Sequence, residues 1–378
     1  MEQKQKRAVC ISCFQHHYES RIKYVIKELD AAKFNVTLII SDFDHIKKRY
    51  SKFNLNKVIN IHVPSYYKNL SLFRILSHFV FAIQSYKAIK KIQPDYIYYL
   101  IPPNSPIKYI KKYKRKNNCI IIFDIYDCWP ESFPYGKYKI LLYFPFMYWK
   151  KIRDKHLNCA NKLICVSEDC AAYMKSIHPK IKTEVLLPFI DEGDCSNYNS
   201  SIDNQLEICY LGSINHLFDI ELCLKILSAI NKIHHVTLHI IGEGENLKVF
   251  KSKCEEVGII VVCHGVIYEW EKKKGIFEYC SFGLNVYKTS AHVTMTLKSI
   301  EYIKAGIPLI NNAFGDTEEM VKKYNIGINI REYSFLEIAE IIKDLSSEKL
   351  ITMHENCLKL NSNKFRNQNV KKILGLSI

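Results

Sequence analysis

The stretch Leu297-Lys-Ser-Ile-Glu-Tyr-Ile-Lys-Ala-Gly-Ile-Pro-Leu-Ile310 predicts a short helix that ends at Gly306 and runs directly into a buried strand. Backbone N–H groups at a helix N-terminus bind anions. Glu301, one turn into the helix, can accept hydrogen bonds from the two vicinal hydroxyls of a ribose. The stretch therefore predicts a site for a nucleoside diphosphate. The alternative is the ordinary helix-glycine-strand junction of any α/β domain.

The composition describes a globular protein with an anionic partner. The length of 378 residues favours two domains, each with its own core. Apolar residues make up 48% and charged residues 24%, which excludes a disordered chain. Because 54 Lys and Arg stand against 38 Asp and Glu, the net charge of +16 predicts contact with nucleic acid, a phosphorylated substrate or an acidic membrane surface.

The chain is expected to be cytoplasmic. Residues 1–7 are charged and the apolar run 8–14 is too short for a signal peptide, and no stretch reaches the roughly 18 apolar residues that cross a bilayer. The 14 cysteines lie in strand-like apolar runs, as reduced buried cysteines do. Cys10 and Cys13 form a Cys-x-x-Cys without a second pair, and on one strand they would face opposite sides, so no redox or metal role is expected.

The first half of the chain alternates between strand and helix patterns. Ile22, Val25, Ile26 and Leu29 repeat at helical spacing. Further helices are expected over 70–93 and 106–116, and strands over 8–14, 34–41, 58–63, 96–101, 119–125 and 162–166. Such alternation predicts a parallel, doubly wound sheet.

The second half repeats this organisation after a polar junction at 191–205. Strands are expected over 206–211, 236–241, 259–263, 282–286 and 308–311, with helices over 220–230 and 247–257. We therefore predict an N-terminal domain 1–190, a C-terminal domain 206–363, and a final segment 364–378 that returns to the first domain. A ligand crevice is expected at the carboxyl ends of the strands.

Five short sequence motifs of the second half occur in the same order as in one enzyme family. Glu301, Gly306 and Pro308 have its Glu-Gly-Pro spacing. Four further turns match, at 210–214, 240–244, 263–266 and 315–321. The chain thereby resembles the retaining glycosyltransferases of family 4. The resemblance implies the GT-B fold, in which two Rossmann-like domains with parallel doubly wound sheets face each other, and a nucleotide-sugar donor.

The resemblance implies that the donor binds to the second half of the chain. This sequence differs from the family pattern at the residues that contact the donor phosphates. Ser213 and Phe218 stand where the family has Arg and Lys, and Val293 stands where it has a first Glu. The start of the 297–305 helix, with Lys298, is therefore the expected diphosphate contact, although most lysines are solvated surface residues. The predicted donor-binding residues are Gly212, Ser213, His216, Gly242, Gly244, Gly265, Lys288, Thr296, Leu297, Lys298, Ser299 and Glu301.

The acid-rich loop 123–132 of the first half resembles an Asp-x-Trp-Pro-Glu-Ser element of the polysaccharide-assembly subset (capsule or O-antigen) of these enzymes. Asp127 and Glu131 are candidates to orient sugar hydroxyls or to accept the acceptor's proton. His17, in the loop after the first strand, is expected to face the same crevice and is the third catalytic candidate. Alternatively, Asp124 or Asp127 caps the next turn.

No metal or other cofactor is expected. Asp42-Phe-Asp44 has the metal signature of the other glycosyltransferase fold, but it lies in the acceptor half and is interpreted as a loop coincidence. Metal-independent activity is therefore predicted.

Residues 137–153 place aromatic residues between basic clusters, a pattern typical of a segment on an anionic membrane. The alternative is a buried helix with charged ends. Pro145 predicts that any helix here is bent or broken. The helix 71–91 is a second candidate membrane contact.

Together these features predict transfer of a sugar from a nucleotide-diphosphate donor to a lipid-linked oligosaccharide, for cell-surface polysaccharide, at the inner face of the cell membrane. One alternative is a nucleotide-sugar 2-epimerase, which would need a denser set of carboxylates and histidines. A nucleic-acid-binding protein is the other, but no basic-aromatic recognition motif appears.

Overall fold

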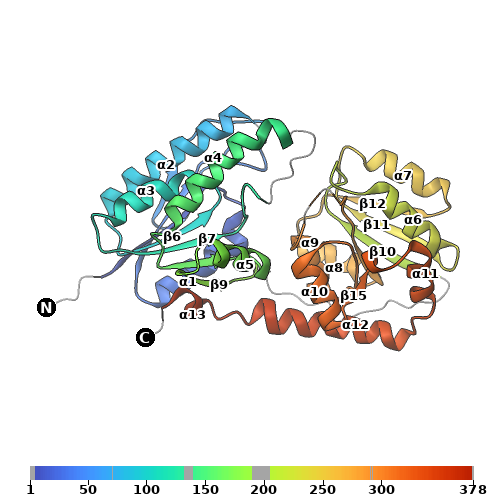
Figure 1. Cartoon of the computed structure of the whole chain (residues 1–378). Coiled ribbons are helices and arrows are strands. Elements are labelled where there is room, and N and C mark those ends of the chain that lie inside the picture. Colours follow the sequence, from blue (N-terminus) through green and yellow to red (C-terminus); the bar gives the residue numbers. More distant parts are fainter. Residues whose placement is uncertain are drawn as a thin grey trace. The chain divides into compact units, whose positions relative to one another are not determined.

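The computed structural model describes residues 5–69, 71–131, 139–189, 205–289, 291 and 293–376. The chain forms two compact units (Figure 1). The N-terminal unit consists of residues 1–189 and 368–378, and the C-terminal unit of residues 190–367. Residues 191–204 of the predicted junction 191–205 lie outside the described residues, and Gln205 begins strand β10.

The N-terminal unit contains a parallel sheet of seven strands in the order β5-β2-β1-β6-β7-β8-β9. Its strands are β1 Arg7–Ser12, β2 Asn35–Ser41, β5 Val58–Ile61, β6 Tyr96–Ile101, β7 Ile120–Ile125, β8 Lys162–Cys165 and β9 Lys182–Val185. The predicted parallel, doubly wound sheet is confirmed. A small hairpin of β3 Phe43–Asp44 and β4 Arg49–Tyr50, and the edge strand β9, were not predicted.

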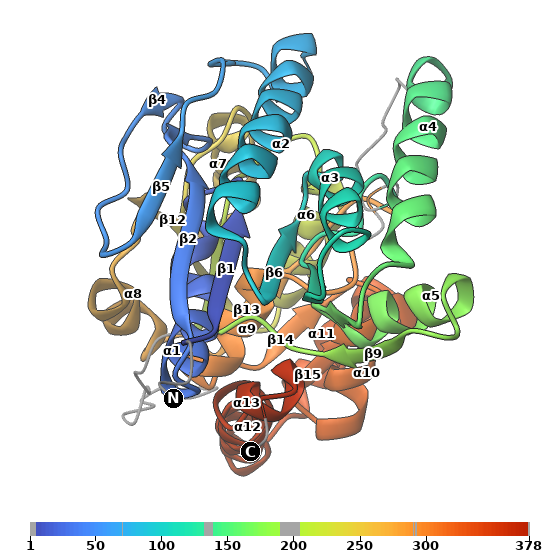
Figure 2. The same ribbon diagram turned by 90° about the vertical axis from the view of Figure 1, so that its left-hand side faces the viewer.

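Helices cover both faces of this sheet. They are α1 Lys23–Ala31, α2 Leu72–Ile92, α3 Ser105–Lys114, α4 Lys139–Leu157, α5 Glu168–Ile177 and α13 Val370–Leu374, with a π-helical turn Tyr18–Ile22 before α1. Phe81, Ile110 and Met174 place α2, α3 and α5 on one face, and Val25 and Leu374 place α1 and α13 on the other. Figure 2 shows α2, α3 and α4 side by side.

Cys10 and Cys13 belong to the cores on opposite faces of the sheet, as predicted from strand alternation. Burial raises the pKa of both thiols. Both are free and packed as small apolar side chains.

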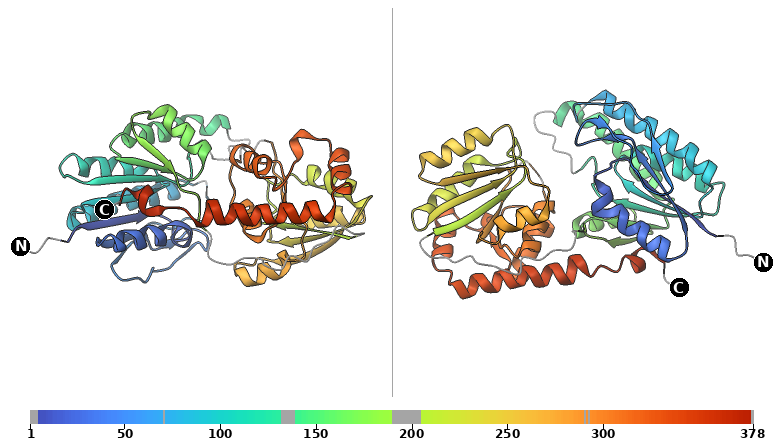
Figure 3. Two further views of the ribbon diagram at one scale, coloured as in Figure 1. Left: turned by 90° about the horizontal axis from the view of Figure 1, so that it is seen from below. Right: turned by 180° about the vertical axis from the view of Figure 1, so that it is seen from behind.

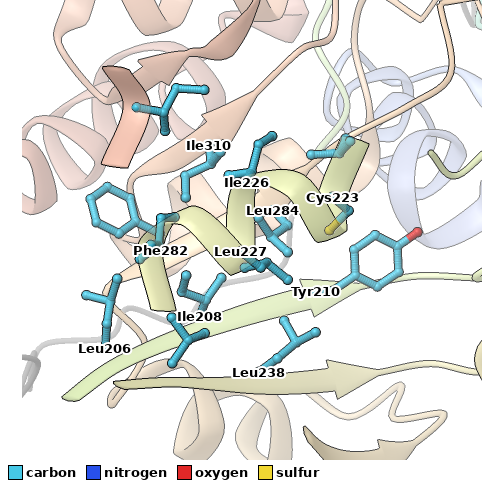
Figure 4. Packing of buried hydrophobic residues seen from close by; sticks show 14 of the residues in the cluster. Leu206, Ile208, Tyr210, Cys223, Ile226, Leu227, Leu238, Phe282, Leu284 and Ile310 are labelled. Atoms are coloured by element: carbon cyan, nitrogen blue, oxygen red, sulfur yellow. The ribbon is translucent and has the colours of Figure 1, made fainter. Parts of the chain in front are cut away.

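The C-terminal unit contains a second parallel sheet, of six strands in the order β12-β11-β10-β13-β14-β15. Its strands are β10 Gln205–Leu211, β11 His235–Ile241, β12 Ile260–Gly265, β13 Phe282–Asn285, β14 Leu309–Asn311 and β15 Gly327–Asn329. Its helices are α6 Ile220–Asn231, α7 Leu247–Glu256, α8 Trp270–Phe277, α9 Leu297–Ala305, α10 Gly315–Tyr324, α11 Phe335–Lys343 and α12 Ser347–Leu360. Ile208, Leu227 and Leu284 pack between sheet and helix in its core (Figure 4).

The end of the chain packs on the N-terminal unit. After α12 and a π-helical turn Asn361–Arg366, the Gln368 side chain donates to the Leu187 carbonyl at 3.1 Å and accepts from the Leu187 N–H at 2.6 Å. The Tyr96 hydroxyl donates to the Leu374 carbonyl at 3.0 Å. The red C-terminal helices can be followed in Figure 3.

Helix α4 continues from Lys139 to Leu157 with Pro145 inside it. Of the predicted bend or break at Pro145, the break is therefore wrong, and the bend stays a prediction. A proline removes one donor and one helical hydrogen bond. No helix within the described ranges has the length and apolar character needed to cross a membrane.

Candidate functional site

The C-terminal unit contains a pocket of about 430 Å³ at the carboxyl ends of three neighbouring strands. The loops after β10, β11 and β12 form most of it, and α8 and α9 contribute one charged residue each. This is where ligands bind in open α/β sheets. Its lining residues are Leu211, Gly212, Ser213, Ile241, Gly242, Glu243, Val266, Ile267, Tyr268, Lys273 and Glu301.

Glycine is required where the first two loops touch. Gly242 has a φ of +148°, and a Cβ atom there would lie 2.1 Å from the carbonyl oxygen of Gly212. The Gly212 N–H in turn donates to the Ile241 carbonyl at 2.9 Å. Because no side chain fits between these loops, their backbone itself lines the pocket and is open to a ligand.

Glu301 enters this pocket as one half of an ion pair. The Lys273 ammonium, from α8, donates to Glu301 Oε2. Lys273 is only 7% exposed, whereas the side chain of Glu301 keeps 25% of its surface exposed. Among the described residues, the other carboxylate oxygen has no hydrogen-bond partner and can accept from a ligand hydroxyl. Lys273 is not among the residues predicted from the sequence, because nothing in its local pattern separates it from the neighbouring Lys272 and Lys274.

The helix that carries Glu301 forms as predicted. Thr296 caps its start, accepting from the Ser299 N–H at 3.0 Å, and Gly306 ends it with a φ of +75°. The cap occupies the Ser299 N–H, so that donor is not available to an anion.

Lys298 lies in a different environment from the one predicted. Its ammonium is 4.4 Å from the centre of the Tyr210 ring and 4.2 Å from that of Tyr287. Burial lowers the pKa of Lys298 to about 7. The side chain is 9% exposed and does not line the pocket, because the two rings enclose it. Its contact with the donor phosphates stays a prediction.

The predicted donor residues therefore separate into two groups. Gly212, Ser213, Gly242 and Glu301 line the pocket. His216 and Lys288 are exposed side chains outside the described lining. The remaining candidates are also absent from the lining and lie next to the pocket loops or in the first turn of α9: Gly244, Gly265, Thr296, Leu297 and the buried Lys298 and Ser299.

In the N-terminal unit, Asp124 at the end of β7 forms a buried ion pair with Arg21 at 3.1 Å. The Tyr98 hydroxyl also donates to this carboxylate. Burial raises the pKa of Asp124, while the charge of Arg21 opposes that shift. Asp124 therefore supports the fold between β7 and the turn before α1. Asp127, two residues beyond the strand, is half-buried, and its charge acts on the buried Arg74.

Glu131 is held by a set of donors that the sequence did not reveal. Its oxygens accept from Arg153 at 2.7 and 2.8 Å, from Tyr173, and from Lys150 at 3.2 Å. Burial alone would raise the pKa of Glu131, but the hydrogen bonds and charge of Arg153 outweigh it and lower the pKa to about 2. Such a carboxylate is a weak general base. Of its two predicted roles, only orienting a hydroxyl fits this geometry.

His17 lies in a cluster of aromatic rings. It is 8% exposed, with ring centres 4.1 Å from His16 and 4.7 Å from Tyr126. Burial, reinforced by His16, His45 and Arg21, lowers its pKa well below the usual value. The imidazole is therefore neutral at physiological pH.

The Asp-x-Asp pair takes part in local structure. Asp42 accepts from His62 at 2.8 Å, and Asp44 accepts from the N–H groups of Ile46 and Lys47 at 2.8 and 2.9 Å. Within the described ranges, no three His, Cys, Asp or Glu side chains are grouped to hold a metal ion. Metal independence stays a prediction.

The predicted membrane segment has an inner and an outer face. The outer face exposes Tyr143, Phe144, Met147 and Tyr148, with Phe144 79% exposed. Phe146, at 6%, faces inward. The predicted apolar contact is thus wrong for Phe146, because it lies on the opposite side of the helix from its neighbours.

The basic residues of this segment divide in the same way. Arg153 is fully buried and Lys150 pairs with Glu131, so neither is available as predicted for an anionic surface. Lys151 is exposed. Lys137 and the side chain of Lys139 lie outside the described structure.

The first turns of α2 reverse the usual pattern of burial. Leu72 is 82% exposed, Phe73 65% and Leu76 49%, whereas Arg74 and His78 are buried. Contiguous exposed apolar side chains are a feature of protein and membrane contact surfaces.

Two family models match the chain, one on each side of the junction. The model described as Glycosyltransferase Family 4 matches residues 19–193, and the model described as Glycosyl transferases group 1 matches residues 197–365. No protein in the curated set matches the sequence significantly.

Several solved structures share the fold at low identity. Sucrose-phosphate synthase from Thermosynechococcus elongatus is 14% identical, with a TM-score of 0.68 over 98% of this chain and 96% of that one. The apo lipopolysaccharide outer core galactosyltransferase WaaB is 15% identical, with a TM-score of 0.65 over 98% of each chain. HepE of Anabaena, solved with UDP-glucose, is 12% identical, with a TM-score of 0.61 over 98% of this chain and 97% of that one.

Proposed function

This chain is a glycosyltransferase of the GT-B fold, and we propose that it transfers a sugar from a nucleoside-diphosphate donor to a lipid-linked saccharide during cell-surface polysaccharide synthesis. The proposal of a nucleoside-diphosphate donor rests on the pocket at the strand ends of the C-terminal unit, in which Lys273 forms an ion pair with Glu301. A ribose presents two adjacent hydroxyl donors, and a carboxylate is the acceptor that binds them most strongly.

UDP is the donor nucleotide we favour. HepE binds UDP and UDP-glucose, and the fold of this chain is similar to it. The backbone of Gly212, Ser213 and Gly242 lines the space in which a diphosphate would follow the ribose. The Gly212 N–H is occupied by the Ile241 carbonyl, so the proposed backbone donor to the diphosphate is the Ser213 N–H. Fixed backbone donors stabilise the charge that develops on a leaving diphosphate without needing a metal ion.

The acceptor is proposed to bind the N-terminal unit. His17 follows the carboxyl end of β1, and Asp127 and Glu131 follow the carboxyl end of β7. Asp127 and Glu131 would orient sugar hydroxyls there. Membrane attachment of the acceptor is supported by the exposed apolar faces of α2 and α4 in the same unit. We accordingly place the enzyme at the inner face of the cell membrane, peripherally bound to anionic lipid.

The donor assignment is tested by thermal unfolding with a panel of nucleotide sugars. A cognate ligand at about 100 times its Kd stabilises the folded chain by about 2.7 kcal/mol. UDP-glucose or UDP-galactose should raise the Tm, and GDP-mannose at the same concentration should not. A panel in which no nucleotide sugar raises the Tm would reject the donor site.

The membrane assignment is tested by sedimentation with vesicles of anionic or neutral lipid. Wild type should pellet only with the anionic vesicles. Phe144→Glu with Tyr148→Glu should leave the protein in the supernatant, because two carboxylates would enter the interface. Leu336→Glu with Ile351→Glu is the control, since these residues are also exposed (58% and 48%) but belong to the C-terminal unit. Equal pelleting of the two double variants would reject α4 as the contact.

A further inference from the structure

A second pocket, of about 350 Å³, lies in the N-terminal unit between the C-terminal end of α3 and the residues after α4. Helices α3 and α4 connect parallel strands and run back along the sheet. Their C-terminal ends therefore lie at the amino-terminal ends of the strands, whereas Asp127 and Glu131 follow the carboxyl end of β7. The pocket is separate from the proposed acceptor residues. It is lined by Lys111, Lys114, Arg115, Asn158, Cys159 and Ala160.

The pocket is cationic and has no acidic residue in its lining. Four more basic residues flank it in the sequence: Lys108, Lys112, Lys116 and Lys155. In the part of the chain that the structure describes, none of these seven side chains forms an ion pair with a carboxylate. Unpaired cations gathered in this way attract a multiply charged anion.

Neutral acceptors hold two of the lysines in place. The Lys111 ammonium donates to the Lys155 carbonyl at 3.1 Å and to Asn158 Oδ1 at 2.7 Å. The Lys114 ammonium donates to Asn161 Oδ1. These contacts orient the ammonium groups without neutralising them.

The neighbouring His156 is affected by the same positive charges. Burial lowers its pKa, and the charges of Lys111, Lys155, Lys108 and Arg115 lower it further.

We propose that this pocket binds the phosphate of an anionic lipid headgroup. The inference rests on the membrane contact proposed above, because α3 and α4 belong to the helical layer whose α2 and α4 expose apolar side chains (Figure 2). A membrane on that layer would meet apolar residues near the starts of α2 and α4 and cations at the ends of α3 and α4. A nucleic acid is less favoured, because the lining has no aromatic side chain for base stacking.

The test compares two double variants that remove the same charge. Lys114→Gln with Arg115→Gln removes two lining cations. Lys112→Gln with Lys116→Gln removes two exposed cations of the same segment outside the lining. Affinity is measured with phosphatidylglycerol and phosphatidylcholine vesicles, using the full chain. The conservative pair Lys114→Arg with Arg115→Lys checks that charge rather than folding is responsible, and UDP binding by the other unit checks integrity.

The lining variant should lose about thirtyfold in affinity for phosphatidylglycerol vesicles, at about fivefold per basic residue near the surface. The flanking variant should lose clearly less, and the conservative pair should bind like wild type. Equal losses in the two Gln variants would overturn the pocket, since only net charge would then matter. In that case the loss of binding by Phe144→Glu with Tyr148→Glu would still support the membrane contact itself.

Two further experiments distinguish a lipid headgroup from a soluble phosphate ligand and from a nucleic acid. Saturable binding of glycerol 3-phosphate that is lost in the lining variant, with unchanged vesicle binding, would overturn the lipid assignment in favour of a soluble ligand. A gel shift with RNA at physiological salt, lost only in the lining variant, would overturn it in favour of nucleic acid. Wild type that ignores phosphatidylglycerol vesicles at low salt would overturn both the pocket and the membrane contact.

Discussion

Glu301→Gln should weaken binding of UDP and also reduce the stability of the C-terminal unit. The carboxylate lines the pocket with one oxygen on Lys273 and the other without a protein partner among the described residues. The amide that replaces it keeps one acceptor oxygen but loses the charge. The ribose then loses charge-assisted hydrogen bonds, and Lys273 loses its counter-ion.

The two effects have different sizes. A hydrogen bond to a charged group contributes about 1.5–3 kcal/mol, so the Kd for UDP should rise by about 10- to 150-fold. Breaking a fully buried ion pair costs about 3–5 kcal/mol. Because the side chain of Glu301 is 25% exposed, we expect a smaller loss of stability, about 1–3 kcal/mol, and a lower Tm.

Titration calorimetry with UDP measures the first effect and thermal unfolding the second. Glu243→Gln is the matched control, because Glu243 also lines the pocket but is exposed. Lys273→Met separates the two roles of Glu301. It removes the ion pair while keeping the carboxylate, so UDP affinity should fall less than in Glu301→Gln. A Kd in Glu301→Gln within twofold of the Kd in Glu243→Gln would refute the ribose assignment.

Three further outcomes are expected. Turnover should persist in EDTA, and loss of activity restored by Mn²⁺ or Mg²⁺ would show that a metal site was overlooked. Acid should weaken the N-terminal unit through Glu131. Its pKa falls from 4.5 in the unfolded chain to about 2 in the folded one, so its contribution is complete above about pH 4.5 and is lost as the pH falls toward 2. That contribution is at most about 3 kcal/mol before solvent screening. Glu131→Gln should therefore remove part of the acid sensitivity seen in urea unfolding, and an unchanged pH profile would contradict the ion pair with Arg153. Gly242→Ala should abolish UDP binding and lower the Tm, because its Cβ would lie 2.1 Å from a carbonyl oxygen. Gly275→Ala, whose Cβ meets nothing within 4 Å, should do neither, and similar behaviour of the two variants would refute the close approach of the loops.

Local pattern was enough to predict most of the fold. The strand expected over 96–101 forms over those residues, and the helix expected at Glu301 ends at Gly306. Both depend on interactions within a few residues, namely apolar runs, caps and glycine at positive φ, which the order of amino acids encodes directly. Of the four glycines predicted to bind the donor, Gly212 and Gly242 line the pocket, whereas Gly244 and Gly265 are absent from its lining.

The tertiary structure decided which charges meet. Glu301 pairs with Lys273, 28 residues earlier, and Asp124 with Arg21, 103 residues earlier. No local pattern marks such partners, because side chains far apart in the sequence are brought together only when strands align in one sheet. The same reason explains Lys298, which reads as a free cation in the sequence but is enclosed by two tyrosine rings from neighbouring strand ends.

Exposure of the helices was also decided by packing. The sequence of α4 determined that its aromatic residues lie between basic ones, and its helical period determined that these residues are distributed over different faces. Only the tertiary contacts decided which side chains turn inward: Arg153 is buried against Glu131 and Phe146 is buried as well, whereas Phe144 and Tyr148 remain exposed. A buried ion pair is tolerated where further hydrogen bonds satisfy its groups, as the donors around Glu131 do.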